Sequence, residues 1–146
     1  MQSEKPQDAV SNIAVARTIA SRSSKANAAS SSRLRTAVNW AVDYAWWAAE
    51  PGQKELTDRL HAFFASQGMD TYVNQYSLDG VPLAETRTTG LIACNGAAAL
   101  AATHPRAWDF VRALWELEPP SGQWRYYDGL LSFMAVLHAG GRFRIY

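Results

Sequence analysis

From Arg33 onward, apolar residues recur every three or four positions, in segments separated by breaks that contain Gly and Pro. This period predicts a first helix over about 33–50, ended by Pro51-Gly52. Its apolar stripe consists of Leu34, Val38, Ala41, Val42, Ala45 and Ala49. A second helix is expected over about 53–66, with Gly68 as its C-cap.

The helical period then stops and returns after a long interruption. Residues 69–89 predict a loop with a short extended segment and a turn at Asp79-Gly80. Three more helices are expected after it, at about 91–102, 105–117 and 128–139, the last stopped by Gly140-Gly141. The helix over 105–117 is expected to bury Trp108, Val111, Leu114 and Trp115.

Helix pairs joined by one long loop predict an all-α fold, an α/α toroid or a piece of one. Residues 1–31 differ in character, because they are rich in Ser and Ala and carry no apolar stripe. We interpret them as a low-complexity tail, disordered or weakly helical, in front of a helical domain over 32–146.

Charge and composition exclude several classes of function. The net charge of +1 gives no electrostatic argument for nucleic acid or for an anionic membrane as partner. No apolar run reaches the roughly 18–20 residues of a membrane span, and no signal-peptide pattern is seen, which favours a cytoplasmic location. The lone Cys94 excludes an intramolecular disulfide, and His61, His104 and His138 lack metal-ligand spacing.

The densest group of candidate chemistry is Arg125-Tyr126-Tyr127-Asp128, which follows a Pro- and Gly-containing turn. Two phenols, a guanidinium and a carboxylate can grip a polar, ring-shaped ligand. The adjacent Trp124 is the best candidate for a sugar-stacking platform, with helix packing as the alternative. Asp128 is expected to cap the last helix.

Five segments together resemble the family 8 glycoside hydrolases, and they are residues 39–47, 63–68, 76–80, 90–95 and 124–129. The similarity extends from Arg35 to Tyr146 and is greatest to the reducing-end xylose-releasing exo-oligoxylanases. It implies the C-terminal part of an (α/α)6 barrel, with about five helices of the toroid. It also implies inverting hydrolysis of β-1,4-linked oligo- or polysaccharide of the xylan type, without cofactor or metal.

Inverting hydrolysis uses a carboxylic acid and a carboxylate base about 6.5–9.5 Å apart. By the resemblance, the acid lies in a part of the barrel outside this sequence, and the position of the base reads Ser32. Arg35 and Tyr126 take supporting catalytic roles. The substrate contacts implied are Arg87, which replaces a histidine of the reducing-end enzymes, with Trp124 and Tyr127. We therefore expect a truncated chain with weak or no hydrolytic activity.

Two other interpretations stay open. The chain could be a non-catalytic helical module that binds glycan or protein through the Trp124/Tyr126 loop, or a non-functional gene remnant. The expected partner is an oligosaccharide, with no nucleic acid and no membrane. Part of a barrel also exposes apolar faces, which predicts self-association or pairing with a complementary N-terminal fragment.

Overall fold

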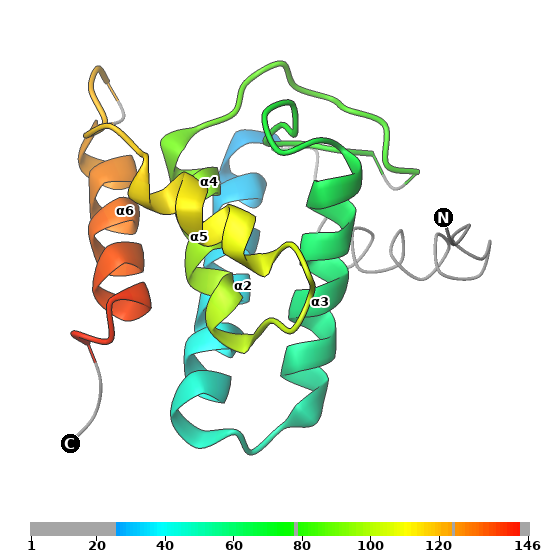
Figure 1. Ribbon diagram of the computed structural model, residues 1–146. Helices are drawn as coiled ribbons and strands as arrows, with labels where there is room; N and C mark the ends of the chain where they lie inside the picture. Colours follow the sequence, from blue (N-terminus) through cyan, green and yellow to red (C-terminus); the bar gives the residue numbers. More distant parts are fainter. Residues whose placement is uncertain (1–25, 78, 124, 144–146) are drawn as a thin grey trace.

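The computed structural model describes residues 26–77, 79–123 and 125–143 (Figure 1). This part of the chain holds five α-helices, one 3-10 helix and no strand, which confirms the all-α prediction. The elements are α2 (Ala26–Trp47), α3 (Pro51–Ser66), α4 (Thr89–Ala98), η1 (Ala99–Ala101), α5 (Ala107–Trp115) and α6 (Arg125–Ala139).

The first helix begins earlier than its apolar stripe predicts. α2 starts at Ala26, so residues 26–31, which were assigned to the tail, are helical. Ala is the strongest helix former, and here it outweighs the serines between the alanines. The rest of the tail lies outside the described residues, so the domain boundary at residue 31 stays a prediction.

The connection between α2 and α3 also differs in detail from the prediction. α2 ends at Trp47, and Ala48 turns the chain with a φ of 48°. Pro51 occupies the first turn of α3 and does not terminate α2. Pro suits this position because its missing N–H would have no helical partner there. Glu50 caps the helix, since its Oε1 accepts a hydrogen bond of 3.2 Å from the Gly52 N–H.

α2, α4 and α6 run in the same direction, and α3 runs opposite to α2 (Figure 1). α4 lies between α2 and α6 and contacts both. It is buried from Gly90 to Ala98. Its small residues let α5 approach closely: a Cβ added at Gly96 would lie 2.6 Å from the Leu114 Cβ.

An aromatic cluster fastens the long loop, residues 67–88, onto the helices. Phe64 on α3 packs against Tyr72 of the loop, with ring centroids 5.1 Å apart, and Phe63 meets Tyr76 at 4.9 Å. Phe110 of α5 completes the cluster, 6.2 Å from Tyr72. Stacked and tilted rings of this kind add packing energy beyond their buried area. The described part of the loop is therefore attached to the core through Tyr72 and Tyr76.

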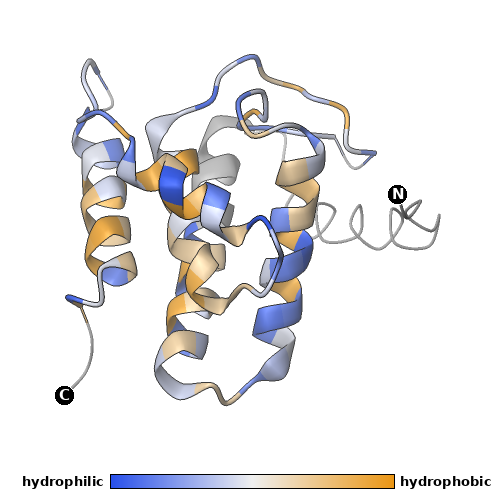
Figure 2. Ribbon diagram, viewed as in Figure 1, coloured by the Kyte–Doolittle hydropathy of each residue, from blue (hydrophilic) through white to orange (hydrophobic). Residues whose placement is uncertain are grey.

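The face that α5 buries is only partly the predicted one. Leu114 is buried as predicted, whereas Trp108 and Trp115 are 76% and 55% exposed. Phe110, which was not predicted, is buried as well. α6 likewise keeps an exposed apolar stripe, formed by Tyr126, Leu130 and Phe133. Figure 2 shows hydrophobic colour along α6, at one edge of the molecule, as well as on α5. Large apolar side chains thus remain uncovered on both of these helices.

Candidate functional site

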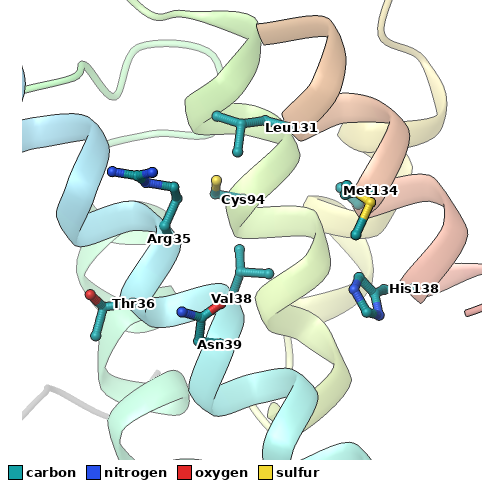
Figure 3. A pocket seen from close by; sticks show the side chains of 9 residues that line it. Arg35, Thr36, Val38, Asn39, Cys94, Leu131, Met134 and His138 are labelled. Carbon is teal, nitrogen blue, oxygen red and sulfur yellow. The ribbon is translucent and has the colours of Figure 1, made fainter. Parts of the chain in front are cut away.

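A groove runs between α2 and α6, with α4 as its floor (Figure 3). Its volume is about 350 Å³, within the range of small-ligand pockets. Arg35 projects from α2, Cys94 lies on the floor, and Met134 and His138 come from α6. The other lining residues are Thr36, Val38, Asn39, Leu131 and Ala135. The walls are thus mostly apolar, with a guanidinium, a hydroxyl, an amide and an imidazole placed along them.

Opposite charges flank the floor of the groove at Cys94. Burial and, to a smaller extent, the charge of Asp128 raise the pKa of this thiol to about 12, against a lowering effect of Arg35. Cys94 therefore stays a protonated thiol at neutral pH and is not a nucleophile.

Asp128 lies directly against the start of α4. A Cβ built on Gly90 would stand 2.7 Å from the Asp128 Oδ1, closer than real Cβ contacts allow. Asp128 is not the N-cap of α6 that the sequence predicted, because this helix already begins at Arg125. Its carboxylate has no hydrogen-bond or ion-pair partner within the described residues, and burial raises its pKa.

The two tyrosines of the motif point into different surroundings. Tyr126 is 80% exposed, and the Arg125 guanidinium lies 4.9 Å from the centre of its ring. Tyr127 is half-buried, and its hydroxyl is buried without a hydrogen-bond partner in the described structure. A buried hydroxyl without a partner is costly, so Tyr127 is the stronger candidate for a ligand contact.

Arg87 comes from the end of the long loop, three residues before Gly90. Its guanidinium lies 4.5 Å from the centre of the Tyr72 ring. The Arg87 Nε and the Tyr72 hydroxyl are both buried without partners in the described part of the chain. The adjacent Thr88 caps α4, since its Oγ1 accepts a hydrogen bond of 3.3 Å from the Leu91 N–H.

The structure thus brings only some of the predicted site residues together. Arg35 lines the groove and Arg87 precedes its floor helix, but nothing described joins Tyr126 to Arg35. Trp124 lies outside the described residues, and Ser32 is within α2 with its side chain also outside them. The roles assigned to these residues therefore stay predictions.

Sequence reasoning missed the contact between Asp128 and Gly90. The two residues are far apart in the chain, so no spacing rule links them, and the only signal is a glycine inside an Ala-rich helix. In the described ranges, no three His, Cys, Asp or Glu residues gather as metal ligands. No helix there combines the length and apolarity that crossing a membrane requires.

Parallel inner helices α2, α4 and α6, backed by α3 and α5, form part of an α/α barrel with a groove lined by polar and apolar groups. No protein-family model matches the chain. Solved structures agree with this class. A GH8 enzyme from Teredinibacter turnerae in complex with xylobiose superimposes with a TM-score of 0.73 and 47% identity, over 77% of this chain and 28% of that one.

Two reducing-end xylose-releasing exo-oligoxylanases are similar in sequence. Rex8A from Paenibacillus barcinonensis is 36% identical over 118 residues, which cover 80% of this chain and 31% of the relative. The enzyme from Halalkalibacterium halodurans is 33% identical over 119 residues, which cover 80% of this chain and 30% of the relative. The structure of Rex8A complexed with xylose matches with a TM-score of 0.72.

The chain is therefore homologous to part of a family 8 glycoside hydrolase, as its motifs predicted. It spans about 30% of the length of the curated relatives it matches.

Proposed function

We propose that the groove between α2 and α6 is part of a glycan site, and that the chain recognises β-1,4-linked oligosaccharides of the xylan type. The observation that carries this proposal is the 47% identity to a GH8 enzyme whose structure holds xylobiose. The chemistry of the groove supports it. The Arg35 guanidinium, the Asn39 amide and the His138 imidazole that line it suit sugar hydroxyls, which both donate and accept hydrogen bonds.

Hydrolysis is the finer part of the proposal. By family resemblance, the reaction would proceed with inversion and would need an acid and a base on opposite faces of the sugar. Arg35 and Tyr126 would orient the base and the attacking water. Ser32 stands at the position of the base, and a serine hydroxyl is not basic at neutral pH without a partner. We therefore expect these 146 residues to bind xylo-oligosaccharide and to hydrolyse it weakly or not at all.

A second candidate function is non-catalytic binding through α6. Tyr126, Leu130 and Phe133 are 80%, 61% and 59% exposed, and their spacing places them on one side of the helix. An exposed apolar stripe of this kind is typical of protein contacts. Self-association or a complementary fragment of the barrel would cover it. Sedimentation velocity across a dilution series measures this, and a monomer at all concentrations would speak against self-association.

The test of the first proposal is binding and product release with xylotriose and xylohexaose, using the purified 146-residue chain. Chromatography detects products, and the anomeric NMR signal of new reducing ends reports inversion or retention. Tyr126→Phe removes the hydroxyl expected to position water, and Tyr44→Phe on α2 is the matched control.

Affinity without turnover is the expected result. Turnover abolished by Tyr126→Phe alone would show that another carboxylate acts as base. Absence of both affinity and turnover would refute the glycan proposal.

A further inference from the structure

We infer that His138 is a ligand-binding residue of the groove, whose imidazole forms hydrogen bonds with hydroxyls of a xylose unit bound at the end of the groove where α2 and α6 meet. This inference rests on the proposed glycan function and adds a residue to it. Trp46 and Phe143 are positioning residues, because their rings hold the imidazole in place.

The first step is the place of His138 in the groove. The residue lies in the last turn of α6 and lines the groove, and Figure 3 shows its imidazole projecting from α6 toward α4. Its ring contacts Trp46 in the last turn of α2, with 5.9 Å between the ring centroids. Since the groove lies between these two helices, this contact closes one end of it. A sugar that reaches this end therefore meets His138.

The second step is the fixed orientation of the imidazole. The Phe143 ring meets it edge to face, with the centroids 4.8 Å apart, and the Trp46 ring is tilted against it. The His138 residue is only 8% exposed. A side chain held in this way loses little rotamer freedom when a ligand binds, which lowers the entropic cost of the contact.

The third step is the missing hydrogen-bond partner. His61, the histidine of the core, has its Nε2 3.0 Å from the Asn95 carbonyl oxygen. His138 forms no hydrogen bond or ion pair within the described residues, although it is buried as well. Buried polar groups are normally paired. Because the imidazole lines the groove, its partners must enter through the groove: water in the free protein, and hydroxyls when a sugar is bound.

The fourth step is the match between the imidazole and a sugar hydroxyl. Burial lowers the pKa of His138, so the ring is neutral at pH 7. A neutral imidazole has one N–H donor and one nitrogen acceptor, and a hydroxyl both donates and accepts. Met134 and Ala135 line the same part of α6 and can pack against the C–H groups of a pyranose ring.

The experiment measures xylohexaose affinity by titration calorimetry and the urea midpoint of the same samples, with the full chain and three variants. His138→Phe removes both nitrogens and keeps an aromatic ring against Trp46 and Phe143, whereas His138→Gln keeps a donor and an acceptor. His104→Gln is the matched control, because His104 precedes α5 and does not line the groove. The net contribution of a neutral hydrogen bond predicts an affinity loss of about 3- to 10-fold for His138→Phe. His138→Gln should lose less, and His104→Gln should leave the affinity unchanged.

NMR separates a direct contact from an indirect effect. The chain has three histidines, so the imidazole ¹⁵N signals are assigned by their loss in His138→Gln and His104→Gln. The His138 signals should shift during the titration with the dissociation constant found by calorimetry, while those of His61 and His104 stay in place. The urea midpoint of His138→Phe should equal or exceed that of the unchanged chain, because an apolar ring replaces an unpaired polar one.

Three outcomes would overturn the inference. If the unchanged chain binds xylohexaose and either His138→Phe binds it equally well or the His138 signals do not shift, His138 is not a ligand contact, while the glycan proposal stands. If the affinity of both His138 variants falls only in step with a lower urea midpoint, the residue is structural. If the unchanged chain shows no affinity, both proposals fail together.

Discussion

Phe110 is the side chain on which the packing of α5 depends, and replacing it by Ala is the sharpest test of this structure. The residue is fully buried. Its ring stacks on His61 of α3 with 4.2 Å between centroids, and lies 6.2 Å from Tyr72 of the long loop. Phe110→Ala therefore removes the contacts of α5 with α3 and with the long loop that carries Arg87.

The expected cost is about 3–5 kcal/mol, because the lost transfer energy of a buried phenylalanine adds to the cavity that it leaves. A domain of this size has a free energy of unfolding of about 5–15 kcal/mol, so the variant would be near its limit of stability. Trp108, two residues away on the other side of α5, is 76% exposed. Trp108→Ala should change the free energy of unfolding by only about 0.5 kcal/mol.

Urea denaturation followed by far-ultraviolet circular dichroism measures both variants without relying on the tryptophan signal. Phe110→Ala should lower the midpoint by about 2 M, and Trp108→Ala should leave it nearly unchanged. A larger loss of stability for Trp108→Ala than for Phe110→Ala would refute the observed choice of buried face on α5. A midpoint of the unchanged chain that rises with protein concentration would instead show that Trp108 is covered in an assembly.

Three further predictions concern the packing around α4. Asp58→Ala should cost about 2 kcal/mol in urea melts, because the carboxylate accepts two backbone N–H groups in the turn before α5, at 2.5 and 2.7 Å. Burial lowers the pKa of His61 from 6.5 to about 4, so between these pH values the unfolded chain binds a proton that the folded chain does not. The free energy of unfolding should therefore fall by roughly 3 kcal/mol between pH 6.5 and 4. His61→Gln should flatten this pH dependence. Gly96→Ala should lower the free energy of unfolding by about 1–3 kcal/mol, seen as a lower thermal midpoint. Ala favours helices, but its Cβ would overlap Leu114.

Periodicity predicted the existence and order of the helices, but it could not choose the face of a short one. α5 carries Trp108, Phe110, Leu114 and Trp115 within nine residues, on one wide apolar arc with the two tryptophans at one edge and Phe110 and Leu114 at the other. The structure buries Phe110 and Leu114, because the gap left by Gly96 on α4 admits only that face of the helix. This is a tertiary constraint, and hydrophobicity along one segment does not contain it.

Only those residues of the candidate site that lie in recognisable motifs could be predicted from the sequence. The Arg-Tyr-Tyr-Asp motif indicated the start of α6 as part of a site. The family resemblance indicated Arg35. The contact that fixes Asp128 joins it to Gly90 at the start of another helix, and neither residue signals the other in sequence. The expected cap was a reasonable prediction from an Asp near a helix start, but α6 begins one turn earlier.

The lengths of the connections explain why the polar groups gather at one end of the helices. α2 and α3 are joined at the opposite end by residues 48–50 alone, and η1 and α5 by residues 102–106. At the end where α4 and α6 begin, the connections are residues 67–88 and 116–124, and they bring Arg87 and the tyrosine motif next to the starts of these helices. Short connections keep neighbouring helices antiparallel and closely packed, whereas long ones can vary without disturbing that packing. Stability therefore depends on α4 and the aromatic cluster, and ligand preference is expected to depend on side chains such as Arg87 and Tyr127 near the starts of α4 and α6.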